Sequence, residues 1–237
     1  MKRRLGCSAQ GVIKRSKFKD EFKILYVEGL RKAGFPEHPP LKLPDKLSIA
    51  VLPFTNMSDD NAQEYFSDGI TEDIITDLSK LSKLFVVARN SSFRYKGCTI
   101  DPKRVGRELR AKYLLEGSVR CAGDQLRISA QLIDAQTGGQ IWAERYDGKL
   151  ADTFTLQDKV TARIIEAMAI NLGAEERKNL VDHGTNNFAA HDAFLKGQSH
   201  ARQFTPEGFA SAIKQFELAL KLDPLYSRAK AAIAQMR

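Results

Sequence analysis

Residues 113–146, YLLEGSVRCAGDQLRISAQLIDAQTGGQIWAERY, decide the fold class, because apolar residues recur there with the two-residue period of a β-strand. Ala122-Gly123-Asp124 and Thr137-Gly138-Gly139 interrupt the period with residues typical of tight turns. The pattern predicts three strands, over 113–121, 125–134 and 140–146, joined as an antiparallel meander.

Short apolar runs alternate with amphipathic segments on the amino-terminal side of this meander. Residues 48–54, SIAVLPF, and 84–88, LFVVA, are typical of buried strands, and the polar residues 55–62 are predicted to form a loop. Apolar residues return at helical spacing over 63–80. Asp101-Pro102 supplies the N-cap and first-turn proline of a second helix. Because a helix connects the first two strands, we expect them to be parallel.

A long helix is predicted after the meander, over 154–172, with Gly173 as its stop. The resulting order of elements predicts an α+β fold over residues 48–173, with a five-stranded mixed sheet and helices packed on it. Three acidic residues of the first helix are expected to lie mostly away from its apolar stripe: Asp68, Asp73 and Asp77.

Positive charge is concentrated in residues 1–47, which hold 12 Lys or Arg against 5 Asp or Glu, a net of +7 of the chain's +8. The remaining residues hold 25 against 24. A short amphipathic helix is predicted over 17–33, and four prolines between Pro36 and Pro44 indicate a semi-rigid spacer. A basic segment of this kind is either a solvated arm or a contact for nucleic acid or anionic lipid.

The sequence predicts neither a membrane span nor an export signal. No run approaches the roughly 18 apolar residues of a transmembrane helix, and charge resumes soon after the basic start without an apolar stretch. The cysteines, Cys7, Cys98 and Cys121, form no CxxC pair. This usage favours reduced thiols and a cytoplasmic location.

Several motifs keep a fixed order along the chain. They are the strand 48–54, the helical motif 65–74 (YFSDGITEDI), the segment 88–97 (ARNSSFRYKG) and the meander motifs 115–120 (LEGSVR) and 140–146 (QIWAERY). Together they resemble the TolB-like domain of bacterial class III adenylate cyclases and winged-helix regulators, which is similar to the amino-terminal domain of the Tol-Pal protein TolB. The resemblance covers residues from about 24 to 173 and implies a cyclase-type signalling context.

Two further helices are predicted over 188–203 and 206–221, after a polar linker over 174–188. The second helix is similar to the tetratricopeptide repeat, with characteristic residues at Ala212, Phe216, Ala219 and Pro224. The resemblance implies partial repeat helices over 189–237 that pack through these residues and present a groove to a protein partner.

So short a repeat segment does not bury its apolar face alone. Either these helices dock on the α+β domain, or a partner covers them, or the chain is a truncated relative of a longer protein. The first helix departs from the repeat pattern at Ala193 and His200.

No motif for a phosphate loop, a dinucleotide fold, a serine nucleophile or a zinc site occurs in the chain. We therefore expect no catalytic residue, no cofactor and no metal. The candidate ligand or interaction site is Arg89, Asn90, Ser91 and Ser92, because loops after parallel strands often bind ligands. The alternative is that Asn90 and Ser91 cap local backbone groups while Arg89 pairs with a carboxylate.

The leading hypothesis is a non-catalytic regulatory or protein-interaction module of an adenylate cyclase-type signalling protein. The metal-holding catalytic domain of a class III cyclase would need more residues than precede Ser48. One alternative is a nucleic-acid-associated transcriptional regulator that uses the basic residues 1–47. Another is residual adenylate cyclase activity.

Overall fold

The computed structural model describes residues 47–170 and 183–236. Lys46 to Arg237 form one compact unit. Its sheet is six-stranded and mixed, with the order β3-β1-β4-β5-β6 and β2 paired to β4 beside that path. The strands are β1 (Leu47–Val51), β2 (Thr55–Asn56), β3 (Leu84–Val86), β4 (Tyr113–Ala122), β5 (Gln125–Asp134) and β6 (Gln140–Lys149).

The pairing confirms the predicted parallel start and antiparallel meander. β1 runs parallel to both β3 and β4, and β5 runs antiparallel to β4 and β6. The prediction of five strands was wrong, because β2 lies in the stretch predicted as a loop and pairs in parallel with Ser118 and Val119 of β4. A polar pair of residues that forms a two-residue strand carries no alternating pattern to reveal it.

Seven α-helices accompany the sheet in the described part of the chain. They are α3 (Glu64–Ser79), α4 (Arg89–Ser92), α5 (Pro102–Leu109), α6 (Thr153–Ala167), α8 (Phe188–Ala201), α9 (Pro206–Leu222) and α10 (Ser227–Gln235). The predicted cap of α5 is confirmed, since the side chain of Asp101 accepts a hydrogen bond from the Lys103 amide and Pro102 follows it. The predicted helix over 17–33 lies outside the described residues.

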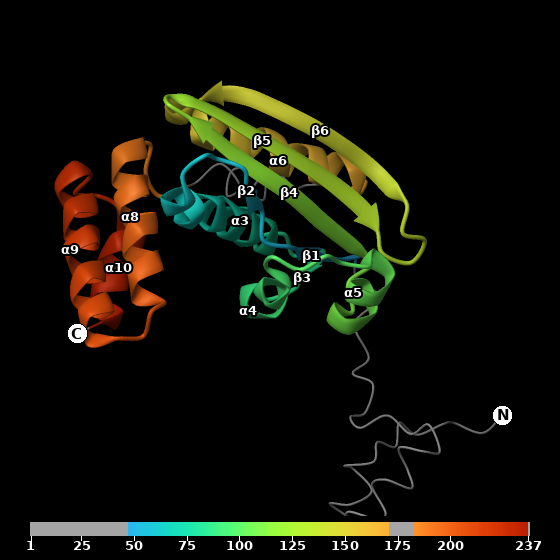
Figure 1. Cartoon of the computed structure of the whole chain (residues 1–237), viewed down its shortest axis with the longest axis horizontal. Helices are drawn as coiled ribbons and strands as arrows, with labels where there is room; N and C mark the ends of the chain where they lie inside the picture. The colour runs from blue at the N-terminus through green and yellow to red at the C-terminus, as the bar shows by residue number, and fades with distance from the viewer. Residues whose placement is uncertain (1–46, 171–182, 237) are drawn as a thin grey trace, which may run out of the picture. The chain divides into compact units, whose positions relative to one another are not determined.

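The two faces of the sheet are covered differently (Figure 1). α3 and α6 lie on one face, where the main core includes Leu115 and Leu132. Their neighbours Leu114 and Ile133 point to the opposite face, into a smaller core beside Val105 of α5. The rest of that second face, over β4, β5 and β6, has polar side chains and no described helix on it.

Helix α6 ends at Ala167, five residues before the predicted end. Ala169 adopts a left-handed conformation with φ 51°. The Ile170 amide donates to the Ile165 carbonyl and the Ala169 amide to the Glu166 carbonyl, the pattern of a Schellman stop. Glycine usually occupies this left-handed position, so the sequence carried no signal for the stop. Leu172 and Gly173 lie outside the described residues.

The segment predicted as a linker before α8 is ordered by hydrogen bonds where it is described. The Thr185 hydroxyl donates to Asp223 Oδ2 over 2.6 Å. Asn187 caps α8 by accepting from the Ala190 amide, and its side-chain amide also donates to the Leu222 carbonyl. These bonds tie the start of α8 to the end of α9.

Helices α8, α9 and α10 pack on one another through a small aromatic core. A Cβ atom at Gly197 would lie 2.5 Å from Phe216 Cε1, so the glycine allows α8 and α9 to approach closely. Phe194 packs between Phe216 and Tyr226, with ring centroids 5.5 and 5.2 Å away. No helix in the described ranges is long and apolar enough to traverse a bilayer.

Candidate functional site

The segment predicted as a polar bend, Arg89 to Ser92, is the short helix α4. Arg89 Nε lies 3.2 Å from Glu72 Oε2 of α3, which confirms the predicted pairing with a carboxylate. The guanidinium also lies 3.6 Å from the centroid of the Phe93 ring. Ser92 is fully buried, whereas Asn90 is exposed. The N-cap position of α4 has no side-chain hydrogen bond. Capping of local backbone groups by Asn90 and Ser91 stays a prediction.

Glu72 joins α4 to the carboxyl-terminal helices. Besides Arg89, its carboxylate accepts a hydrogen bond from the Arg202 guanidinium, at the end of α8. Burial lowers the pKa of the Arg89 guanidinium, and the nearby charge of Arg202 lowers it further. One carboxylate therefore holds two arginines at this junction. Asp68, one turn before Glu72 on α3, forms a separate ion pair, with its Oδ1 2.6 Å from Lys96 Nζ.

Asp73, the next residue of α3, lies at the centre of a buried polar cluster. Its Oδ2 is 3.0 Å from His191 Nε2 of α8, and its Oδ1 is 2.9 Å from an Arg228 nitrogen of α10. Gln157 of α6 donates to Oδ2 over 3.3 Å. Burial alone would raise the pKa of the Asp73 carboxyl, but His191 and Arg228 hold it well below its usual range. The cluster thus ties α3 to helices α6, α8 and α10.

A second hydrogen bond supports the same contact between α3 and α8. The Tyr65 hydroxyl donates to Asp192 Oδ1 over 2.6 Å. Burial and this carboxylate both raise the pKa of Tyr65. In addition, a Cβ atom at Gly69 would lie only 2.5 Å from Leu195 Cδ1, so α8 approaches the α3 backbone closely.

Asp73 and Asp77 were expected to lie mostly away from the apolar stripe of α3, and each is nevertheless only 4% exposed. Helix α3 contacts the sheet on one side and α8 on another. A hydrophobic stripe reveals only the contact with the sheet, whereas the contact with α8 and α10 includes the Asp73 carboxylate, which pairs with His191 and Arg228. The sequence held no signal for those pairs, which join residues far apart in the chain.

The residues assigned to repeat packing occupy the interior of the carboxyl-terminal helices. Ala212, Phe216 and Ala219 are buried between α9 and its neighbours. Pro224 is exposed and follows the Asp223 C-cap of α9. Of the predicted alternatives for the apolar face of these helices, the structure shows docking on the α+β domain.

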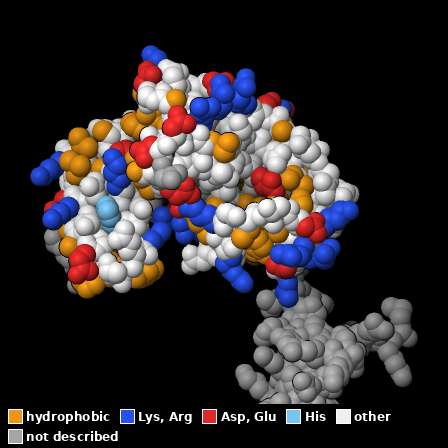
Figure 2. All heavy atoms as spheres, viewed as in Figure 1, with side chains coloured by type: hydrophobic (Ala, Val, Ile, Leu, Met, Phe, Trp, Pro, Cys, Tyr) orange, Lys and Arg blue, Asp and Glu red, His pale blue; other side chains and the backbone are white. Residues whose placement is uncertain are grey.

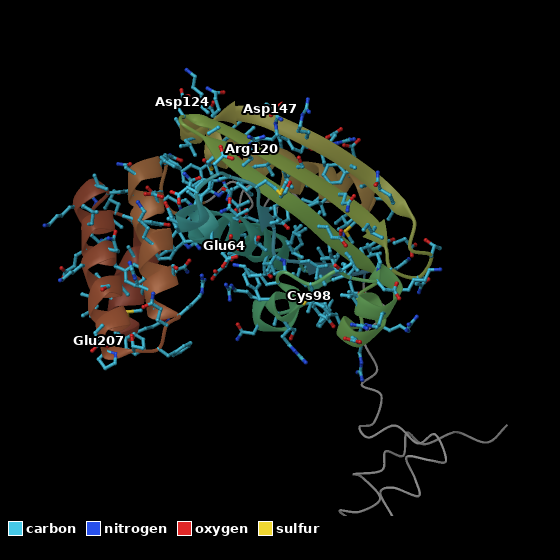
Figure 3. The ribbon with its side chains drawn as sticks, in the orientation of Figure 1. Glu64, Cys98, Arg120, Asp124, Asp147 and Glu207 are labelled. Atoms are coloured by element: carbon cyan, nitrogen blue, oxygen red, sulfur yellow. The ribbon has the colours of Figure 1, made fainter. Side chains whose placement is uncertain are left out.

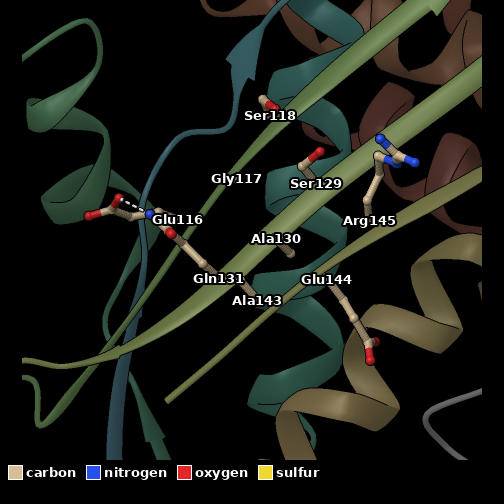
Figure 4. Close-up of a pocket in the computed structure, with 9 residues that line it drawn as sticks. All are labelled: Glu116, Gly117, Ser118, Ser129, Ala130, Gln131, Ala143, Glu144 and Arg145. Carbon is tan, nitrogen blue, oxygen red and sulfur yellow. Dashed lines mark hydrogen bonds between the residues drawn. The ribbon is translucent and has the colours of Figure 1, made fainter. Parts of the chain in front are cut away.

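A separate hollow of about 490 Å³ lies on the polar sheet face, over the middle of β4, β5 and β6 (Figure 4). Gln131 Nε2 donates to Glu116 Oε2 over 2.8 Å at one end of it. Ser118, Ser129 and Arg145 lie along the adjacent strands. No group of three or more His, Cys, Asp or Glu in the described residues has the arrangement of a metal site.

Comparisons with known proteins place the α+β region in a family. The family model "HilA/YgeH-like transcriptional regulator, second domain" matches residues 45–163. "Putative adenylate cyclase 3" of Rhizobium meliloti (strain 1021) is 50% identical over 196 residues, which are 83% of this chain and 33% of that protein. The chain therefore spans about a third of the length of this curated relative.

Two solved structures are distantly similar. TolB from Acinetobacter baumannii has a TM-score of 0.42 at 19% identity, covering 55% of this chain and 30% of that one. Lipoprotein GNA1162 from Neisseria meningitidis has a TM-score of 0.38 at 18% identity, covering 53% of this chain and 99% of that one.

Proposed function

Since the chain belongs through residues 45–163 to the HilA/YgeH-like transcriptional regulator second-domain family, we propose that it is a non-catalytic regulatory and protein-interaction module of an adenylate cyclase-related protein. The family supplies the regulatory context, and the named relative supplies the link to cyclases. On this proposal the chain binds a protein partner and carries out no reaction of its own.

The buried Asp73 cluster is the observation that carries this proposal. Asp73 of α3 holds His191 and Arg228 from two different carboxyl-terminal helices. A buried ionic contact of this kind fixes one geometry, because a displaced partner leaves an uncompensated charge. The α+β domain thereby presents α8, α9 and α10 as a rigid unit, as a docking module requires.

We further propose that α8, α9 and α10 are tetratricopeptide-type helices. Gly197 and Phe216 support this, since the glycine admits the aromatic ring between α8 and α9. Ala212 and Ala219 are fully buried on the same helix as Phe216. In this arrangement the outer surfaces of the three helices remain for a partner.

An assay of cyclase activity tests the non-catalytic part of the proposal. The purified chain is incubated with ATP and Mn²⁺ beside an active class III cyclase, and cyclic AMP is quantified by mass spectrometry. We expect cyclic AMP from the active enzyme and none above background from this chain. Cyclic AMP formed in proportion to the concentration of this chain would overturn the proposal.

The match to a transcriptional regulator family also favours a second candidate, a nucleic-acid-associated regulator. Its contact would be the basic residues 1–47, with a net charge of +7. Binding of a DNA duplex through them should fall steeply as salt rises, because counterions are released from the phosphates. Loss of that binding on deletion of residues 1–46 would support this candidate over the protein-interaction module.

A further inference from the structure

The uncovered face of the meander carries three arginines on neighbouring strands. Arg120 of β4 lies directly opposite Arg127 of β5. Arg127 in turn lies opposite Asp147 of β6, and Arg145 is two residues before Asp147 on the same face. We call these four residues the arginine face. Figure 3 shows Arg120 and Asp147 near the same end of the meander, close to the turn at Asp124.

Charge on the arginine face is not balanced within the described residues. Asp147 is shared, with Oδ1 2.5 Å from Arg127 Nε and Oδ2 3.3 Å from Arg145 Nε. The Arg120 side chain is exposed and makes no ion pair or hydrogen bond with another described residue. Three arginines against one aspartate leave a surplus of two positive charges. Like charges directly opposite each other destabilise a strand pair, so the Arg120–Arg127 pair weakens the free sheet.

The arginine face is hollowed in two places. The hollow beside Arg145 also exposes the hydroxyls of Ser118 and Ser129. A second hollow of about 410 Å³ is lined by Arg120, Arg127 and Asp147. In the space-filling view, Lys and Arg side chains are interspersed with Asp and Glu side chains over the upper edge of the molecule (Figure 2). The two hollows together offer guanidinium and hydroxyl donors along the strands.

We propose that the arginine face binds an acidic, extended peptide segment of a partner protein. Guanidinium groups bind carboxylates through paired, charge-assisted hydrogen bonds, and the surplus charge selects an anionic segment. Bound carboxylates relieve the repulsion between Arg120 and Arg127. The inference rests on the proposed function for the class of partner, and it adds a second protein-binding surface, on the sheet, together with the chemistry of the segment that binds there.

A peptide fits this face better than a nucleic acid does. Residues 48–237 hold 25 Lys or Arg against 24 Asp or Glu, so the body lacks the broad positive field that phosphate backbones require. No aromatic side chain lines either hollow among the described residues, so bases have no stacking partner there.

Fluorescence anisotropy with a defined probe tests the inference. The probe is a fluorescein-labelled decapeptide of five Glu-Ser repeats, titrated with the full chain in 50 mM NaCl. We expect saturable binding and an affinity at least tenfold weaker for the double variant Arg120→Ser/Arg145→Ser. The control Arg94→Ser/Arg107→Ser removes the same charge from exposed arginines outside the meander and should change the affinity less than twofold.

Three outcomes would overturn the assignment. These are absence of saturable peptide binding by the unaltered chain, equal weakening by the control variant, and tighter binding of a 20-base-pair duplex that the same meander variant abolishes. Circular dichroism melting of both variants establishes that they are folded. The cyclic AMP assay is independent of the probe, so a failure of this inference is distinguishable from a failure of the proposed function.

Discussion

Asp73 shows how one side chain can determine the relation between distant parts of a chain. The carboxylate is almost fully buried, yet an amide from α6, a histidine from α8 and an arginine from α10 contact it. Removing one partner of a buried ionic contact leaves the others without compensation. The sequence around Asp73, an acidic residue on an amphipathic helix, gave no indication of this role.

We expect Asp73→Ala to lower the free energy of unfolding by about 3–5 kcal/mol, the usual loss when one member of a buried ion pair is removed. Urea titration followed by circular dichroism measures the change. Asp59→Ala is the matched control, because Asp59 is exposed and an exposed substitution of this kind shifts stability by about 0.5 kcal/mol or less. Equal effects of the two substitutions would contradict the ionic role of Asp73.

His183 predicts a pH dependence near neutrality. Burial alone would lower the pKa of the imidazole, but Asp158 Oδ1 lies 3.0 Å from Nε2 and the net direction is upward. A raised folded-state pKa stabilises the fold below the unfolded value of about 6.5, and this contribution is lost as pH rises through the folded value.

The urea concentration at the midpoint of unfolding should therefore decrease as pH rises from 6 to 8. Asp158→Asn should make that decrease smaller. Urea titrations of the unaltered chain and of Asp158→Asn at pH 6, 7 and 8 provide the measurement. A pH dependence that is identical in both proteins would show that His183 is not responsible for it.

At the scale of elements, the sequence predicted what local chemistry determines. Turn residues at Gly123 and Gly138, both with positive φ, defined the meander, and Asp101-Pro102 defined the start of α5. The misses have non-local causes. β2 exists because β4 offers a partner edge. The polar cluster on α3 exists because α8 and α10 reach it. For Arg89, one of two alternatives from the sequence was pairing with a carboxylate, but only the fold identifies that carboxylate as Glu72.

The contact between α3 and α8 leads to a prediction about Gly69. Alanine in a helix interior usually stabilises relative to glycine by up to about 1 kcal/mol. Here the added methyl would lie 2.5 Å from the buried Leu195, so we expect Gly69→Ala to destabilise by about 1–3 kcal/mol instead.

Leu195→Ala opens space for that methyl and costs about 2–5 kcal/mol by itself. The double variant Gly69→Ala/Leu195→Ala should lose at least about 1 kcal/mol less than the sum of the single losses, because the two sites share one contact. The pair Gly69→Ala/Val105→Ala should be additive, since Val105 lies in the smaller core on the other sheet face. Additive losses in the first pair would rule out the predicted clash.

At the scale of the whole molecule, the docked helices and the α+β domain share one core. The same contiguous apolar cluster contains Ile128 of β5, Ile70 of α3 and Phe194 of α8. Ionic contacts at Glu72 and Asp73 cross the same boundary. A domain with a shared core and paired buried charges unfolds in one cooperative step.

Trp142, the only tryptophan, lies on β6 and reports on the sheet, whereas far-UV circular dichroism also reports on α8, α9 and α10. We expect the urea transitions from the two signals to coincide in the unaltered chain. In Asp73→Ala the helices lose their ionic attachment, so the dichroism transition should begin at lower urea than the fluorescence transition. Separate transitions in the unaltered chain would contradict the shared core. Coincident ones in Asp73→Ala would mean that apolar contacts such as Gly69–Leu195 hold the helices in place without the buried charges.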